Sequence, residues 1–347
     1  MTTHVILVVT NPLGTHMKKS SNKKPHWQKQ YDALVLAGTA KTTRRAYVRD
    51  TQYFLAWAKL ALKGKQTLPF NDEAIVIFIL QHLQGLPSKI EKALTKNKRK
   101  RPGVLKTSTI KRYLSSVSIL HQEAGFESPT TSQRVRLLMK RARRAKAEAS
   151  PMRKAAITID ILKKLTSVCD NSLHGLRDKA LLLVGFASGG RRRDELAHLL
   201  IEDLTTIKGG YLIRLRKSKT DQTGRGETLP ILGPAATALK KWLMKSGLRK
   251  GRLFRGIKSN GDFYDGIDGR TINRIVKRCA TKADLDASKF GAHSLRAGFV
   301  TESGRQGASL RDAMQLSGHR TVEIAGLYHR EGELLKNPTA RLLQMKS

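Results

Sequence analysis

An excess of positive charge is the feature that most restricts what this chain can fold into. The sequence of 347 residues holds 66 Lys and Arg against 27 Asp and Glu, a formal net charge of +39 at pH 7. Charges of one sign repel one another in a compact domain, and a bound polyanion relieves the repulsion. Both halves of the sequence carry the excess, so we expect both to face nucleic acid.

Helical periodicity covers most of the first half of the sequence. Apolar residues recur there at intervals of three and four, as on one face of a helix. The pattern predicts four helices: one from Thr42 to Ala58, one starting at Asn71 or Asp72, one capped by Ser108 and ending near Gly125, and one containing Val135 to Arg144. The stretch from Gly85 to Gly103 is rich in basic residues and is predicted to be a loop, either solvated or in contact with phosphate.

The second half combines helices with one hairpin. The run Leu176–Ala187 is almost wholly apolar and predicts a helix at the centre of a core. Tyr211–Leu215 and Glu227–Ile231 alternate as antiparallel strands do, and Lys217 and Lys219 lie in the loop between them. Further helices are predicted at 160–169, 234–245, 271–282, 294–306 and 309–316, and apolar residues recur at helical spacing over 334–345. The predicted fold class is therefore mainly α with a small antiparallel β-sheet.

Three adjacent arginines follow the central helix. Gly190 ends the helix, and Arg191–Arg193 come next, shortly before Glu195. Adjacent side chains of a helical turn point in different directions, so we expect at most one arginine to point inward. We expect Arg192 to be the one that points inward, because Glu195 lies three residues after it and can brace it. A basic turn exposed to solvent is the simpler alternative.

A histidine, an arginine and a tyrosine near the end of the chain suggest chemistry on an anion. His293 lies three residues before Arg296, so both side chains share one helix face and can meet one ligand. Arg presents a planar fork of donors that fits phosphate oxygens, and His exchanges a proton near neutral pH. His319 and the hydroxyl nucleophile Tyr328 follow. Taken one at a time, His293 is more simply a buried histidine, Arg296 a surface cation and Tyr328 a core aromatic.

Cysteine content and the N-terminal sequence indicate the compartment. Cys169 and Cys279 are too few for a disulfide framework or a zinc cluster, so we expect structural thiols in a reducing cytosol. The apolar run at 5–9 is too short to cross a membrane and has no basic region before it. We therefore expect a soluble cytoplasmic protein.

The order and spacing of these residues resemble those of a tyrosine recombinase of the phage-integrase superfamily. The similarity covers about residues 40–345 and includes the segments 120–125 and 138–141. The catalytic set of the family falls on six positions of this sequence: Arg192, Lys219, His293, Arg296, His319 and Tyr328. Glu195 takes the acidic position that supports the first arginine. The triplet of arginines around Arg192 is unusual for the family.

The resemblance also implies a domain organisation. It divides the sequence into a flexible basic tail (1–28), a helical core-type DNA-binding domain (29–149), a linker (150–157) and a catalytic domain (158–347), which ends in an oligomerisation helix at about 332–347. The two domains would form a C-shaped clamp on double-stranded DNA, in the nucleoid or on plasmid or phage DNA. Four protomers would hold two duplexes at inverted-repeat sites.

The resemblance further implies a mechanism that uses neither a metal nor a cofactor. Tyr328 would attack a DNA phosphodiester and form a 3′-phosphotyrosine, and strand exchange would pass through a Holliday junction. The two arginines of the set would stabilise the charge on the phosphate. His293 would accept or relay the tyrosine proton, Lys219 would protonate the leaving 5′-oxygen, and His319 would hold a non-bridging oxygen.

Two other functions stay open at this point. A type IB topoisomerase shares this chemistry but acts as a monomer on one duplex, and the apolar stretch after Tyr328 disfavours it. A catalytically silent DNA-binding regulator would also be basic and helical. Binding alone does not require the nucleophile, so the complete set of residues disfavours this second alternative.

Overall fold

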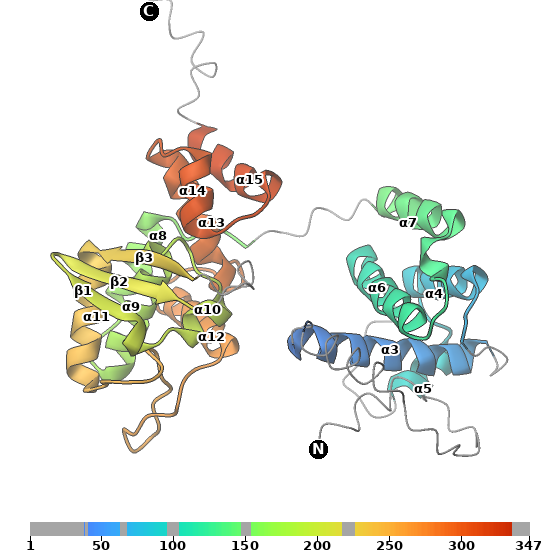
Figure 1. The fold of residues 1–347 in the computed structure, drawn as a ribbon, viewed down its shortest axis with the longest axis horizontal. Coiled ribbons are helices and arrows are strands. Elements are labelled where there is room, and N and C mark those ends of the chain that lie inside the picture. The colour runs from blue at the N-terminus through green and yellow to red at the C-terminus, as the bar shows by residue number, and fades with distance from the viewer. Residues whose placement is uncertain are drawn as a thin grey trace, which may run out of the picture. The chain divides into compact units, whose positions relative to one another are not determined.

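The chain folds into two compact units. The computed structural model describes residues 38, 41–62, 68–95, 104–146, 154–216 and 226–334. Unit 1 is Met1–Pro151 and unit 2 is Met152–Ser347 (Figure 1). None of the helices in the described ranges is both long enough and apolar enough to cross a membrane.

Unit 1 is helical in its described part. Its elements are α3 (Lys41–Ala61), α4 (Asp72–Gln84), α5 (Ser88–Thr95), α6 (Thr107–Glu123), the 3-10 turn η1 (Pro129–Thr131) and α7 (Gln133–Ala145). Helix α4 begins where the sequence predicts, because Oδ1 of Asn71 accepts a hydrogen bond from the backbone N–H of Ala74 at 3.0 Å. The predicted inner face of α4 is buried, as expected: Ile75, Phe78, Ile79 and Leu83.

Two predictions for unit 1 are wrong. The stretch after Gly85 contains helix α5, whose Ile90 and Leu94 pack against the core of the unit. Helix α6 begins at Thr107, so Ser108 is not its cap. Thr107 is buried in the first turn, and the N-cap residue Lys106 makes no capping hydrogen bond with its side chain. Packing against the core, rather than local capping, therefore sets the start of α6.

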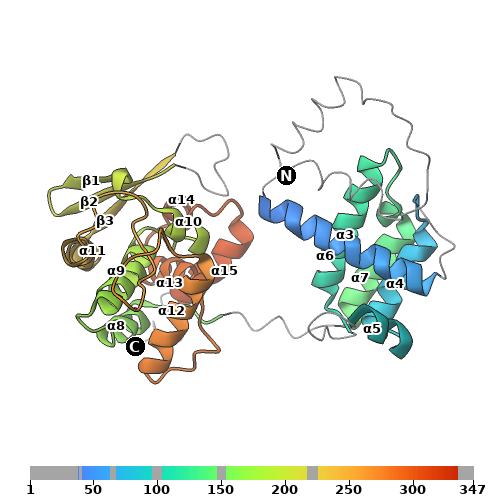
Figure 2. The ribbon, with the colours of Figure 1, turned by 90° about the horizontal axis from the view of Figure 1, so that it is seen from below.

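Unit 2 surrounds one apolar helix with a small sheet and further helices. Its elements are α8 (Ile159–Ser167), α9 (Leu173–Ala187), α10 (Arg193–His198), η2 (Ile201–Asp203), β1 (Leu204–Ile207), β2 (Gly210–Leu215), β3 (Glu227–Leu232), α11 (Gly233–Ser246), α12 (Gly269–Lys282), α13 (Ala292–Arg305), α14 (Leu310–Ser317) and α15 (Val322–Glu333). The strands are antiparallel in the order β1-β2-β3. Helix α11 packs against β2 and β3 (Figure 2).

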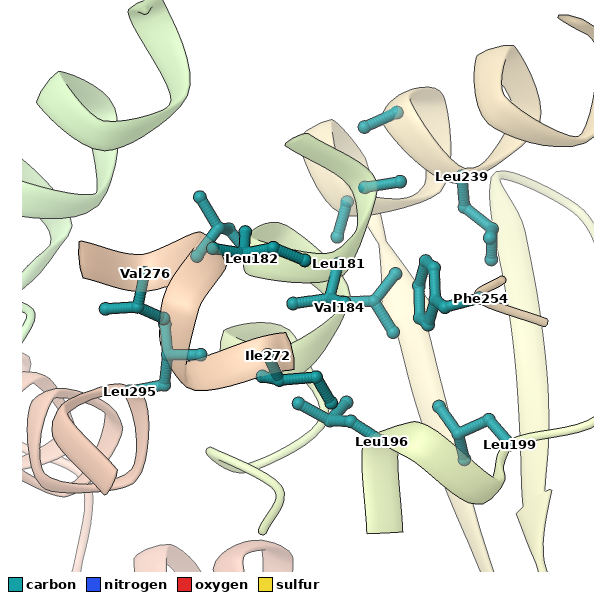
Figure 3. Packing of buried hydrophobic residues seen from close by; sticks show 14 of the residues in the cluster. Leu181, Leu182, Val184, Leu196, Leu199, Leu239, Phe254, Ile272, Val276 and Leu295 are labelled. Carbon is teal, nitrogen blue, oxygen red and sulfur yellow. The ribbon is translucent and has the colours of Figure 1, made fainter. Parts of the chain in front are cut away.

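Helix α9 forms the centre of the core in unit 2, as its composition predicts. Leu181 and Val184 are fully buried and lie between Phe254 and Leu239 on one side and Leu295 of α13 on the other (Figure 3). Burial of each such side chain stabilises the fold by about 1.5–3 kcal/mol. Because Leu295 is part of this core, the neighbouring residues of α13 are held in a fixed position.

The mainly α fold with a small antiparallel sheet is confirmed, and unit 2 contains three helices or strands that were not predicted. Strand β1, helix α10 and helix α15 have no counterpart among the predicted elements. Strand β1 is short and mostly exposed, and it depends on pairing with β2, which places Leu204 opposite Ile213. The two cysteines, Cys169 and Cys279, are free thiols whose Sγ atoms lie 3.9 Å apart.

His82 is a buried polar residue in the aromatic core of unit 1. Its Nδ1 donates to the carbonyl oxygen of Phe78 at 2.7 Å, and its Nε2 accepts from the hydroxyl of Tyr53 at 2.9 Å. This arrangement fits the neutral imidazole with its proton on Nδ1. Burial lowers the pKa of His82 from 6.5 to about 4, partly offset by the hydrogen bond to Phe78.

We predict that His82 makes the stability of unit 1 depend on pH. Between pH 6.5 and 4 the unfolded chain binds a proton at this position and the folded unit does not, so stability falls as the pH drops through this window. The loss amounts to at most about 3 kcal/mol. Amide hydrogen exchange of α4 at pH 6.5 and 4.5, corrected for intrinsic rates, should show the loss in the wild type and a smaller one in His82→Gln. Equal losses in both proteins would contradict the prediction.

Candidate active site

A glycine turn brings the arginine triplet against helix α13. Gly189 and Gly190 follow α9 with φ values of 89° and 70°, a region that favours glycine. A Cβ at Gly190 would overlap the Cα of Arg296. The carbonyl oxygen of Gly190 accepts a hydrogen bond from Nη1 of Arg296 at 3.4 Å. The turn after α9 and the middle of α13 therefore touch through their backbones.

Arg192 is fixed by Glu195, as the sequence predicts. Arg192 is the N-cap of α10, and its backbone N–H donates to Oε2 of Glu195 at 3.1 Å. Its Nη1 donates to Oε1 of the same carboxylate at 2.8 Å. The Glu195 side chain is buried, whereas that of Arg192 is 24% exposed. The carboxylate thus holds a guanidinium that stays accessible to a ligand.

The fully buried arginine of the triplet is Arg191, which corrects the expectation for Arg192. The side chain of Arg191 is 2% exposed and that of Arg193 is 48% exposed. Nη1 of Arg191 donates to Glu227 at 3.1 Å and Nη2 donates to the carbonyl oxygen of Leu316. These acceptors come from distant parts of the sequence, so local spacing gives no sign of them.

One nitrogen of Arg296 is buried and has no hydrogen-bond partner within the described part of the chain. His293 and Arg296 lie one turn apart on α13, which confirms that they share a helix. Nε of Arg296 donates to Nε2 of His319 at 3.1 Å. Its Nη2 is buried and makes no hydrogen bond to any of the residues that the structure describes. This nitrogen is a donor available for an acceptor from outside the protein.

His319 is held from both sides. It follows Gly318, which ends α14 in the left-handed conformation with φ 67°. Since an arginine only donates, Nε2 of His319 accepts from Arg296, and the ring proton is on Nδ1. Nδ1 lies 2.7 Å from Oγ of Ser317 and donates to it. Burial, followed by the charges of Arg296, Arg192 and Arg191, lowers the pKa of His319 from 6.5 to about 4.

Like charges crowd this part of unit 2. Burial lowers the pKa of Arg296 to about 10, with further contributions from Arg192 and Arg191. His293 lies in the first turn of α13 with part of its surface exposed. Desolvation of the rest of the ring, followed by the charges of Arg193, Arg296 and Arg192, lowers its pKa. Glu195 and Glu227 oppose the effect on Arg296 without cancelling it. An anion would relieve this uncompensated charge.

Tyr328 lies on α15, which is anchored on α13. It is half-buried, and α15 begins three residues after His319. A Cβ at Gly332 would overlap the carbonyl oxygen of Thr301, so the backbones of the two helices are in contact. His329, next to Tyr328, is buried and its Nε2 donates to the carbonyl oxygen of Ala308 at 2.8 Å. The tyrosine is thus tied to the helix that carries His293 and Arg296.

Lys219 lies outside the described residues, as does Lys217. The described chain stops at Arg216 after β2 and resumes at Gly226 before β3. Sequence reasoning missed Ser317, Glu227 and Arg191 as parts of the site. Ser317 could have been predicted from the sequence, because a serine two residues before a histidine can form a hydrogen bond to the imidazole.

Comparisons with known proteins show which family this sequence matches. The model of the phage integrase family matches residues 155–333, more than half of the chain. The integrase/recombinase xerD homolog of Selenomonas ruminantium is 31% identical over 309 residues, which cover 86% of this chain and 84% of that protein. Recombinase cre of Escherichia phage P1 is 24% identical over 258 residues, which cover 69% of this chain and 75% of that protein.

The fold agrees as well. A lambda integrase tetramer bound to a Holliday junction matches with a TM-score of 0.52 at 16% identity, over 88% of this chain and 77% of that one. The family match, the similarity over most of both chains and the shared fold lead to one conclusion. The chain belongs to the phage integrase family, the tyrosine site-specific recombinases.

Proposed function

We propose that this chain cuts a DNA strand by transferring its phosphate to Tyr328 and then rejoins the strand to a different 5′-hydroxyl. The proposal depends mainly on the buried Nη2 of Arg296, which has no partner among the described residues. A buried donor without an acceptor costs about 1–3 kcal/mol. A non-bridging phosphate oxygen would remove this cost and would supply the negative charge that the surrounding cations lack.

The cations would be in position before DNA binds. Glu195 fixes Arg192, while His319 and the carbonyl oxygen of Gly190 fix Arg296. Phosphoryl transfer depends mostly on positioning and charge stabilisation. Donors that need no rearrangement during the reaction stabilise the transition state most effectively. Arg192 and Arg296 would supply the positive charge on the phosphate.

Each bond and proton has a place in the proposed reaction. Oη of Tyr328 forms a bond to phosphorus while the bond from phosphorus to the 5′-oxygen breaks. His293 accepts the phenol proton, because its lowered pKa keeps the imidazole neutral at pH 7. Lys219 gives a proton to the leaving 5′-oxygen. The energy of the phosphodiester stays in the phosphotyrosine, so the second strand can be joined by the reverse reaction.

His319 would change its partner when DNA binds. In the free protein its Nε2 accepts from Arg296 and so cannot donate to a phosphate oxygen. The negative charge of the phosphate would raise the pKa of His319 by offsetting the nearby cations. The protonated ring could then donate from Nε2 to a non-bridging oxygen, while Nδ1 stays on Ser317.

The partner that fits both units is double-stranded DNA. The net charge of +39 and the similarity to recombinases support this choice. We further propose that four protomers act on two duplexes at inverted-repeat sites and pass through a Holliday junction. The similar fold of the lambda integrase tetramer bound to a Holliday junction supports this arrangement. The expected oligomerisation helix at 332–347 lies outside the described residues from 335 onward.

Substitution of the nucleophile tests the proposal. Tyr328→Phe removes one oxygen and leaves the cations in place, so we expect DNA binding to persist and covalent attachment to disappear. The substrate is a nicked duplex from the DNA that flanks the gene, at the position that footprinting identifies. Covalent complexes of the wild type are digested, and the labelled peptide is sequenced. A label on any residue other than Tyr328 would contradict the assignment.

A sulfur-bridged substrate tests the role of Lys219. A thiol ionises with a pKa of about 8.5, far below that of an alcohol, so a 5′-thiolate leaves without a proton. Lys219→Ala should be severely slowed on normal DNA and largely restored when sulfur replaces the bridging 5′-oxygen. Arg296→Ala loses charge stabilisation and should stay slow on both substrates.

Lys217→Ala is the matched control for the Lys219 experiment. It removes a lysine from the same loop and should cleave both substrates like the wild type. If sulfur substitution rescues Lys217→Ala and not Lys219→Ala, the general acid is Lys217, two residues earlier in the sequence. Failure of both to be rescued would show that the proton comes from another group.

A further inference from the structure

Arg191 is a buried cation that the proposed mechanism does not use. Its side chain is among the largest fully buried ones of the described residues. It bonds to Glu227 through Nη1 and to the carbonyl oxygen of Leu316 through Nη2. The guanidinium thus joins three segments that are far apart in the sequence: the turn after α9, the start of β3 and the end of α14.

Arg191 supplies a hydrogen-bond donor to a carbonyl group in the last turn of α14, that of Leu316. The last carbonyl groups of a helix lack partners inside the helix and form the negative end of its dipole, so a cation is favoured there. The backbone N–H groups of Gly318 and His319 both donate to the carbonyl oxygen of Met314, at 2.8 and 3.2 Å. The carbonyl oxygen of Leu316 receives Arg191 instead. His319 comes three residues after Leu316 in the sequence.

The chain provides both room and a counter-charge for this cation. A Cβ at Gly189 would overlap the carbonyl oxygen of Leu316 and would lie 3.0 Å from Nη2 of Arg191. Glu227 pairs with the guanidinium and is itself 36% exposed. A buried charge without a partner is costly, so the pair is what allows Arg191 to lie inside.

We infer that Arg191 is a positioning residue for strand cleavage, which presents His319 to the phosphate by fixing the last turn of α14. The inference rests on the proposed function, in which His319 acts at the phosphate. Arg191 is buried, so it would act on the phosphate through other residues. Its charge also contributes to the lowered pKa of His319 and of Arg296, as expected for a cation close to both.

A double-mutant cycle tests whether Arg191 acts through His319. Arg191→Met keeps a long side chain and removes both donors, and single-turnover cleavage is measured on the nicked duplex at saturating DNA. Residues that act through one another show strong coupling, so we expect a loss of about tenfold in the wild-type background and less than about twofold in His319→Ala. DNA affinity should stay nearly unchanged. Arg191→Lys keeps the charge but replaces the fork of donors with a single ammonium group, and it should recover part of the rate.

Arg193→Met is the matched control, because Arg193 is the neighbouring arginine and is half exposed. Whatever its effect, it should be the same in both backgrounds. An equal loss from Arg191→Met in both backgrounds would contradict the inference, as would no loss in the wild type. If Arg191→Met does not fold, by circular dichroism, Arg191→Lys in the same cycle decides. A His319→Ala protein that cleaves at the wild-type rate would refute the site assignment in the proposed function as well.

Discussion

Repulsion among buried arginines is the constraint on which the site of unit 2 depends. A cation removed from water costs several kcal/mol unless it is paired and hydrogen-bonded. Each arginine of the site therefore has an acceptor of its own: Glu227 for Arg191, Glu195 for Arg192 and His319 for Arg296. These acceptors come from α10, β3 and the loop after α14, so the core that packs around α9 brings them together.

The acceptors fix the arginines without neutralising them. The carboxylates of Glu227 and Glu195 pair with Arg191 and Arg192. The third arginine, Arg296, donates to the imidazole of His319, which carries no charge at neutral pH. The site therefore keeps a net positive charge and a buried donor on Arg296. In the proposed function, a phosphodiester would supply the charge and the acceptor that are lacking. In this view the energy of binding DNA is partly the relief of repulsion that the fold maintains.

Sequence patterns predicted what depends on local chemistry. The Asn71 cap of α4, the shared helix of His293 and Arg296 and the brace between Arg192 and Glu195 all involve residues within four positions of one another. Non-local features escaped prediction. Strand β1 exists because β2 pairs with it, and the start of α6 depends on the burial of Thr107. The roles of Lys219 and of the stretch from 335 onward remain predictions, since both lie outside the described residues.

Titration of His319 tests most directly whether uncompensated positive charge defines this site. Histidine resonances of the free, 15N-labelled protein can be followed by NMR, with His319 assigned from its absence in His319→Gln. Because burial and the nearby arginines lower the pKa of His319 to about 4, its ring should remain neutral from pH 7.5 down to 5. The pattern should show Nδ1 protonated and Nε2 free of a proton. A titration midpoint at or above 6.5 would mean that the ring is neither buried nor close to the cations, and would contradict the account.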